Sequence, residues 1–129
     1  MKTPMLAADA LILFDEGIVL IRRENSPYQG YYALPGGFVE VGETVEEAAR
    51  REAKEETGLD IILLKLVGVY SKPDRDPRGH VVSICYLALG RGDLLVGSDA
   101  RSAEVFDPED LPPLAFDHAQ IIRDGLEKL

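Results

Sequence analysis

The chain has 129 residues, about one domain's worth, and its 46% hydrophobic and 29% charged residues are typical of a globular protein rather than a disordered one. Its formal net charge of -9 argues against nucleic acid as a partner, because such a footprint needs a clustered basic surface. No apolar run reaches the roughly 18 residues of a membrane span, and the first residues lack the pattern of a signal peptide. We expect one domain over residues 1–129.

Apolar runs bounded by turn residues predict strands over residues 8–14, 18–24, 31–35, 61–71 and 80–90. Asp15, Glu16 and Gly17 form the predicted hairpin turn between the first two strands. A further short strand is predicted at 103–106. The single cysteine, Cys85, stands in a strand and cannot form an internal disulfide, which favours a reducing, cytoplasmic location.

Two helices are predicted. The first begins at Thr44, with Glu47 as the other half of a capping box, and ends at Gly58. The second spans about 117–128, with Asp117 and Gln120 in a similar capping relation. Its buried stripe consists of Ile121, Ile122 and Leu126. Strands and helices mixed in this order predict α/β layers with helices on both sides of a mixed sheet.

Three glutamates of the first helix, Glu52, Glu55 and Glu56, stand three and four residues apart. At 100° per residue they continue the apolar stripe of Val45, Ala48 and Ala49. A carboxylate directed at a core is costly unless it is paired or binds a metal, and converging carboxylates suit Mg²⁺ or Mn²⁺. The alternative is a solvated acidic helix end. Arg51, four residues before Glu55, is placed to orient that side chain.

The surrounding pattern resembles the Nudix box. Five residues separate Gly37 from Glu43, and seven more lead to the run Arg51-Glu52-Ala53-Lys54-Glu55-Glu56-Thr57-Gly58-Leu59, so that every position of the box is filled. Members of the Nudix family hydrolyse nucleoside diphosphates linked to another group, and the resemblance covers nearly the whole chain. It implies a Nudix-type α/β/α sandwich with a mixed β-sheet.

The resemblance also implies a metal site. Glu52 and Glu56 would be ligands, Glu55 a third ligand or the holder of an additional ion, and the backbone carbonyl of Gly36 would complete the set. Mg²⁺, with Mn²⁺ as the alternative, would neutralise the diphosphate and lower the pKa of an attacking water. Gly36 and Gly37 would let the backbone approach the phosphates, although a tight turn explains each glycine equally well.

Residues 71–88 and 111–122 resemble the ADP-ribose pyrophosphatase branch of the family, whose reaction gives AMP and ribose 5-phosphate. Arg75, Arg78 and His80 are the candidates to contact substrate phosphate or ribose. The alternative for the two arginines is ion pairing with Asp74 and Asp76 within the loop. His118 is expected to pack or cap. The tyrosines, for which core packing competes with adenine stacking, are Tyr28, Tyr31 and Tyr32.

Related enzymes often carry a glutamate before a late Trp-Phe strand, and it serves there as catalytic base or extra ligand. This chain departs from that pattern, with Ser102 and Val105 at the corresponding positions. The candidates for the general base are therefore Asp99, Glu104 or a glutamate of the box, and we prefer Glu104 because a slip of one or two residues in this loop is easy.

The expected function is metal-dependent hydrolysis of ADP-ribose by an enzyme whose partner is a small nucleotide. Two alternatives stay open: a Nudix hydrolase for another nucleotide, such as an oxidised dNTP, NADH or a diadenosine polyphosphate, and a non-catalytic ADP-ribose sensor. The complete ligand set argues against the sensor. A homodimer is implied by the resemblance alone.

Overall fold

The computed structural model describes residues 2–95 and 103–129, which form seven strands and two helices. The strands are β1 (Met5–Phe14), β2 (Gly17–Arg22), β3 (Tyr32–Ala33), β4 (Gly36–Phe38), β5 (Asp60–Tyr70), β6 (Val81–Arg91) and β7 (Ala103–Phe106), and the helices are α1 (Val45–Thr57) and α2 (His118–Leu126). Neither of these helices is long and apolar enough to cross a membrane.

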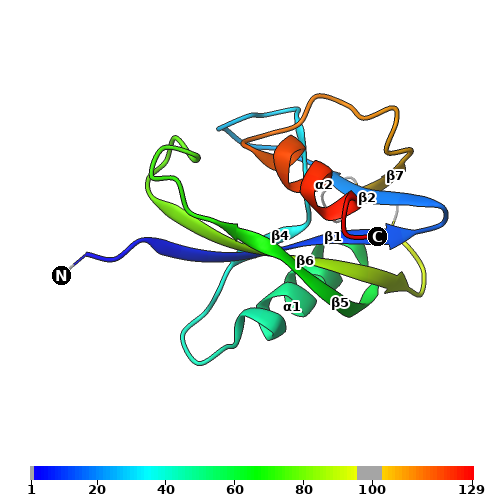
Figure 1. The fold of residues 1–129 in the computed structure, drawn as a ribbon, viewed down its shortest axis with the longest axis horizontal. Helices are drawn as coiled ribbons and strands as arrows, with labels where there is room; N and C mark the ends of the chain where they lie inside the picture. Colours follow the sequence, from blue (N-terminus) through cyan, green and yellow to red (C-terminus); the bar gives the residue numbers. More distant parts are fainter. Residues whose placement is uncertain (1, 96–102) are drawn as a thin grey trace.

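The strands form one mixed sheet in the order β3-β2-β1-β6-β5, with β4 paired to β1 and β7 to β2. β1 and β6 are parallel, and the other pairs are antiparallel. α1 covers one face of the sheet and α2 the other (Figure 1). The α/β/α sandwich with a mixed sheet that the sequence predicts is therefore confirmed.

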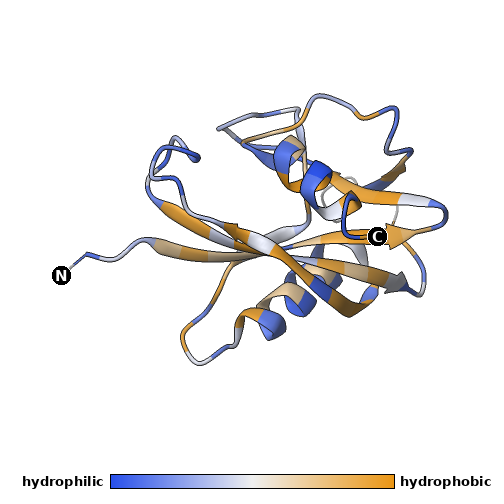
Figure 2. Ribbon diagram, viewed as in Figure 1, coloured by the Kyte–Doolittle hydropathy of each residue, from blue (hydrophilic) through white to orange (hydrophobic). Residues whose placement is uncertain are grey.

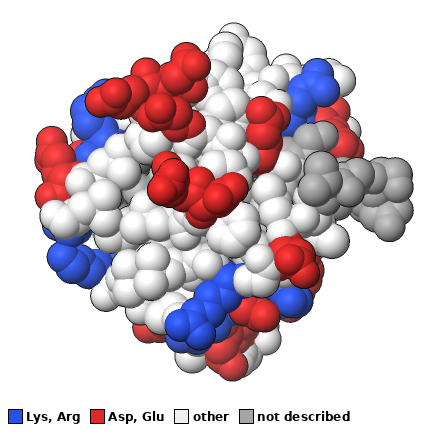
Figure 3. All heavy atoms as spheres, turned by 90° about the vertical axis from the view of Figure 1, so that its right-hand side faces the viewer, with Lys and Arg blue, Asp and Glu red and all other residues white. Residues whose placement is uncertain are grey.

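The central strand β1 is buried on both faces, and its side chains alternate between two cores. Ala10 and Ile12 pack with Ala53 on the α1 side, whereas Leu11 packs with Ile121 on the α2 side. Figure 2 shows the apolar strands between helices whose outer surfaces are hydrophilic. On the face drawn in Figure 3, acidic side chains occupy the middle and basic ones lie toward the margin, in keeping with the net charge of -9.

Local signals for α1 are confirmed. The Thr44 hydroxyl accepts a hydrogen bond from the backbone N–H of Glu47, and the Glu47 carboxylate accepts one from the backbone N–H of Thr44. Gly58 ends the helix in the left-handed conformation, with φ of 78°. The predicted side-chain cap of α2 is wrong: Asp117 makes no such bond, because its carboxylate pairs with Arg75 instead.

β1 changes its partner along its length, and this division creates the main cavity. Its first half pairs with β4, from Ala7 opposite Phe38 to Asp9 opposite Gly36, whereas its last residues pair with β2. Gly36, for which a tight turn was one of the two explanations, lies in β4, and the predicted strand 31–35 is reduced to β3. After β3, which pairs with β2, the chain crosses back and pairs with β1 as β4. The sheet therefore opens beside Asp9.

Candidate functional site

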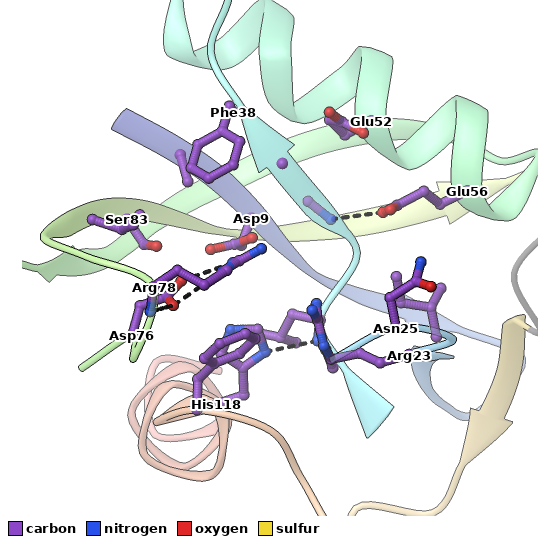
Figure 4. Close-up of a pocket in the computed structure, with 18 of the residues that line it drawn as sticks. Asp9, Arg23, Asn25, Phe38, Glu52, Glu56, Asp76, Arg78, Ser83 and His118 are labelled. Carbon is purple, nitrogen blue, oxygen red and sulfur yellow. Dashed lines mark hydrogen bonds and ion pairs between the residues drawn. The ribbon is translucent and has the colours of Figure 1, made fainter. Parts of the chain in front are cut away.

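A cavity of about 360 Å³ opens at this division of the sheet. Its wall comes from β1, β2 and the segment 23–26 that follows it, β3, β4, α1, the loop 71–80, β6 and the start of α2. In Figure 4, Glu52 and Glu56 project from α1 on one side, while Arg23, Arg78 and His118 lie on the other. The cavity thus has an acidic wall and a wall rich in basic and aromatic groups.

Glu52 and Glu56, the two glutamates of the acidic wall, are buried to different degrees. Glu56 is 4% exposed, and its Oε1 accepts a hydrogen bond of 2.8 Å from the backbone N–H of Gly36. The side chain of Glu52, one helical turn earlier, is 15% exposed. Its carboxylate lies so close to Gly37 that a β-carbon there would overlap it. The glycine at 37 therefore lets the Glu52 carboxylate lie against β4.

Glu55 faces away from this wall, with 57% of its side chain exposed. The expectation that all three glutamates continue the buried stripe is wrong for this residue. In the second half of α1 the buried residues are Ala53, Glu56 and Thr57, and at about 100° per residue their centre lies roughly 150° around the helix from Glu55. The buried face of α1 thus includes Glu56 and leaves Glu55 in solvent.

Arg51 joins the acidic groups to one another. Its Nε and Nη2 donate to both carboxylate oxygens of Glu43, at 2.7 and 3.0 Å, and this hydrogen bonding holds the Glu43 pKa below its usual range. Its Nη1 lies 3.2 Å from Glu52 and 3.5 Å from Glu55. The predicted contact between Arg51 and Glu55 therefore exists, and the same guanidinium also orients Glu52.

The acidic wall offers only oxygen donors, which is the preference of Mg²⁺ and Mn²⁺. In residues 2–95 and 103–129, no three His, Cys, Asp or Glu side chains are gathered closely enough to hold one ion. Mg²⁺ is usually bound by one or two carboxylates, with substrate phosphates and waters at its other positions. Glu52 and Glu56, on the wall of one cavity, fit that role.

Arg75 and Arg78 both line the cavity but are engaged differently. The Arg75 side chain is 4% exposed, and all its nitrogens donate within the protein: to Asp117 at 2.8 and 2.7 Å, to Ser83 at 2.9 Å and to the β6 backbone. The Arg78 side chain is 47% exposed and pairs with Asp76 at 2.7 Å. The predicted ion pair with Asp76 is therefore made by Arg78, whereas Arg75 holds the loop 71–80 against α2 and β6.

Glu104, our preferred candidate for the general base, does not line this cavity in the described part of the chain. It lies on β7, where its carboxylate accepts a hydrogen bond of 3.2 Å from the Tyr32 hydroxyl. The alternative candidate, Asp99, lies outside the described residues. The placement of Glu104 therefore does not favour contact with a water held at the α1 glutamates.

His80 lines a second hollow beside the main cavity, where its Nε2 lies 3.0 Å from a backbone carbonyl of the same loop. The tyrosines considered for adenine stacking pack against other rings. Tyr28 meets Tyr31 edge to face at 5.6 Å between centroids, and Tyr32 meets Phe106 at 4.9 Å. Neither His80 nor these tyrosines join the wall that holds the α1 glutamates.

His118 packs inside the protein, as expected. It is 6% exposed, and its Nδ1 accepts a hydrogen bond of 3.0 Å from the backbone N–H of Leu34. Burial lowers the His118 pKa to about 4, so the ring is neutral at pH 7. This bond fixes the start of α2 to the segment that leads into β4.

Asp9 lies in the cavity wall and was missed as a site residue. It is 6% exposed, it accepts hydrogen bonds from the Ser83 hydroxyl and, at 3.8 Å, from the Cys85 thiol, and burial raises its pKa to about 7. An acidic residue inside the apolar run 8–14 was the available signal. Arg23 and Phe116, which also line the cavity, carry no such signal.

A family model described as the NUDIX domain matches residues 3–125, and the chain belongs to this family. It is 58% identical over 123 residues to the ADP-ribose pyrophosphatase of Methanocaldococcus jannaschii, a match that covers 94% of this chain and 72% of that protein. The resemblance inferred from the box and from residues 71–88 is thereby confirmed.

Two solved structures are similar in fold. The NUDIX domain of Shewanella oneidensis NrtR, complexed with ADP ribose, superposes with a TM-score of 0.85 at 29% identity, covering 99% of this chain and 90% of that one. A bifunctional NMN adenylyltransferase/ADP ribose pyrophosphatase from Francisella tularensis, complexed with AMP and a Mn ion, gives 0.82 at 27% identity, and the match covers 99% of this chain and 42% of that one.

Proposed function

We propose that this protein hydrolyses ADP-ribose to AMP and ribose 5-phosphate with the help of a divalent cation. The observation that carries the proposal is one cavity that joins Glu52 and Glu56 to the close-packed glycines Gly36 and Gly37. The 58% identity to a protein named ADP-ribose pyrophosphatase supports the choice of substrate.

Mg²⁺ is the proposed ion, with Mn²⁺ as a substitute. Glu52, Glu56 and the backbone carbonyl of Gly36 would hold it, and Glu55 would serve a second ion from the solvent side. When bound, the cation neutralises diphosphate charge and lowers the pKa of an attacking water. Arg51 keeps the carboxylates of Glu52 and Glu55 in place through its contacts at 3.2 and 3.5 Å.

The remaining site residues orient the substrate. Gly37 leaves room beside the Glu52 carboxylate, and Arg78 reaches the cavity with a half-exposed guanidinium suited to phosphate. Arg75 acts through the loop that it braces. His80 would contact a distal part of the substrate, because its hollow shares Arg78 with the main cavity. A glutamate of α1 replaces Glu104 as the proposed base.

We also propose a cytoplasmic homodimer. β5 is an edge strand of the sheet, and its Ile62, Leu64 and Leu66 are 41%, 44% and 50% exposed, an arrangement that pairing with a second copy would cover. The buried thiol of Cys85 suits a reducing compartment. Light scattering would support the dimer with a mass about twice the 14.2 kDa of one chain, and a mass of 14.2 kDa would refute it.

The function is tested by incubating the purified protein with ADP-ribose, 8-oxo-dGTP, NADH and a diadenosine polyphosphate, each with Mg²⁺ or EDTA, and separating the products. The proposal predicts AMP and ribose 5-phosphate, formed only with metal, and the highest kcat/KM for ADP-ribose. Faster turnover of another compound would assign a different Nudix substrate. Binding of ADP-ribose without turnover of any compound would point to the sensor.

A further inference from the structure

The main cavity and the second hollow lie on the same face of the sheet. Side chains two residues apart in a strand share a face, so Met5, Ala7 and Asp9 of β1 point to one side. Ala7 and Asp9 line the main cavity, whereas Met5 lines the second hollow, and four residues of a strand span about 13 Å. The residues that line both hollows are Phe38, Arg78 and Val81. The two hollows therefore form one trough, which runs along β1.

Phe38 lies where the two hollows meet. It stands opposite Ala7 in the pairing of β4 with β1, and it is 37% exposed. In Figure 4, Asp9 lies between His118 and Phe38, so the ring belongs to the outer part of the trough. The Phe38 carbonyl accepts a hydrogen bond of 3.1 Å from Arg51 Nη2, which helps to fix the backbone of β4. A half-exposed aromatic ring on a fixed strand is a surface on which a planar base can stack.

The two ends of the trough differ in polarity. At the inner end, Asp9 and Ser83 form part of the floor at 6% and 3% exposure, and Asn25 adds an exposed amide from the wall. Carboxylate, hydroxyl and amide groups match the hydroxyls of a sugar, which both donate and accept hydrogen bonds. At the outer end, the apolar side chain of Met5 lies beside Phe38 and is 53% exposed. That surface suits a planar base better than a sugar.

The inner end also contains an aromatic ring, Phe116, but protein groups already surround it. The Cζ atoms of Arg23 and Arg78 lie 4.9 and 5.5 Å from its centroid, and the ring of Tyr28 meets it edge to face at 4.9 Å. The guanidinium of Arg78 is farther from the Phe38 centroid, at 5.9 Å. Phe38 is therefore the more accessible of these two rings for stacking.

We propose that Phe38 stacks on the adenine base, so that the substrate lies along the trough in one direction, with its adenosine in the second hollow and its terminal ribose beside Asp9 and Asn25. This inference rests on the proposed function, because it takes ADP-ribose as the ligand. The diphosphate then lies between the two ends, at Gly36 and the glutamates of α1. Phe38 is thus the residue that selects for a base at the outer end.

The test is calorimetric titration of the full chain, in the presence of Mg²⁺, with AMP and with ribose 5-phosphate, because each product reports on one end of the trough. We expect Phe38→Leu to weaken AMP binding at least roughly fivefold and to leave ribose 5-phosphate binding unchanged. Phe38→Trp keeps a stacking surface and should keep the affinity for AMP. Tyr31→Leu is the matched control, since it removes a ring of similar exposure, 43%, from outside both hollows.

Asn25→Ala is the reciprocal variant at the inner end. It should weaken ribose 5-phosphate binding roughly three- to tenfold and leave AMP binding unchanged. The reversed pattern, equal weakening of both products by Phe38→Leu, unchanged affinities in either variant, or no AMP binding by wild type would overturn the proposal. ADP-ribose turnover, measured separately, reports on the proposed function. An active enzyme whose Phe38→Leu variant binds AMP like wild type would therefore refute this inference alone.

Discussion

The backbone N–H of Gly36 donates a hydrogen bond of 2.8 Å to Oε1 of Glu56, which ties β4 to the last turn of α1. The bond satisfies a buried carboxylate oxygen and fixes its direction. Glu56 therefore has two roles that can be tested separately. Its structural role is to accept this bond, and its proposed chemical role is to supply negative charge.

Glu56→Gln exploits this separation, because the amide oxygen can still accept the bond from Gly36 while the charge is lost. We expect kcat for ADP-ribose to fall at least roughly 100-fold, which corresponds to about 3 kcal/mol of lost charge stabilisation, with Tm nearly unchanged. Steady-state kinetics and thermal melting measure the two effects.

The exposed Glu109→Gln is the control for Glu56→Gln, since it removes one carboxylate charge from a loop outside the cavity and should leave turnover intact. Glu55→Gln should fall between the two. Full turnover in Glu56→Gln would show that this carboxylate has no part in the reaction.

Gly37→Ala tests the close approach of Glu52 to β4. The added β-carbon would overlap the Glu52 carboxylate and push it out of the cavity wall, so we expect kcat to fall at least roughly tenfold in a folded protein. Gly68→Ala is the matched control, because its β-carbon would meet its nearest neighbour, Tyr70, at an ordinary 3.4 Å. Equal activity of both variants would show that the position of Glu52 does not matter.

Two buried groups should give stability a pH dependence of opposite sign. Burial lowers the His118 pKa from 6.5 to about 4, so in that range the unfolded chain binds a proton that folded His118 does not, and stability rises with pH. Burial raises the Asp9 pKa from 3.8 to about 7, so there the folded chain keeps a proton that the unfolded chain has lost, and stability falls with pH. The two slopes, about 1.4 kcal/mol per pH unit each, nearly cancel.

Asp9→Asn should make the contribution of His118 to the pH dependence of stability measurable, because it removes the opposing contribution of Asp9. Relative to wild type, the free energy of unfolding of this variant should gain about 2 kcal/mol between pH 4.5 and 6, as measured by urea denaturation. His118→Gln should lose a similar amount over the same interval. Parallel curves for wild type and both variants would show that neither group titrates as its burial requires.

Arg75→Lys tests whether Arg75 holds the loop 71–80 in place or contacts the substrate directly. Because Arg75 is buried and bonded to Asp117 and Ser83, the variant should lose about 2 kcal/mol of stability and lower Tm by roughly 5–10 °C. A direct substrate contact would instead raise KM at unchanged Tm. The exposed Arg50→Lys on α1 is the control and should change neither quantity.

Glu104→Gln is expected to keep near-normal turnover, because Glu104 bonds to Tyr32 and lies off the cavity. Kinetics with saturating Mg²⁺ measure it. A loss of 100-fold or more would restore Glu104 as the base and remove the glutamates of α1 from that role.

Prediction from the sequence was most successful for features that depend on residues close together in the chain. The capping box of Thr44 and Glu47 and the left-handed Gly58 depend on residues within one turn of each other. The burial of Glu56 and the exposure of Glu55 depend instead on how α1 lies on the sheet, which a helical wheel centred on Glu52 does not reveal.

Contacts between segments far apart in the chain could not be predicted from the sequence for the same reason. Asp9 meets Gly36 only because β4 pairs with β1, and Arg75 meets Asp117 across 42 positions of the chain. The apolar pattern of each strand fixes which face is buried but not which strand lies beside it. The cavity's basic wall could therefore be assembled only from the fold.

The central claim is that Glu52 and Glu56 hold the divalent cation of the reaction. Its most direct test is titration of Mn²⁺ into the purified protein, with the free ion followed by electron paramagnetic resonance, for wild type beside Glu52→Gln/Glu56→Gln. We predict that wild type binds Mn²⁺ and that the double variant, folded by circular dichroism, does not. Unchanged Mn²⁺ affinity in the folded double variant would contradict the claim.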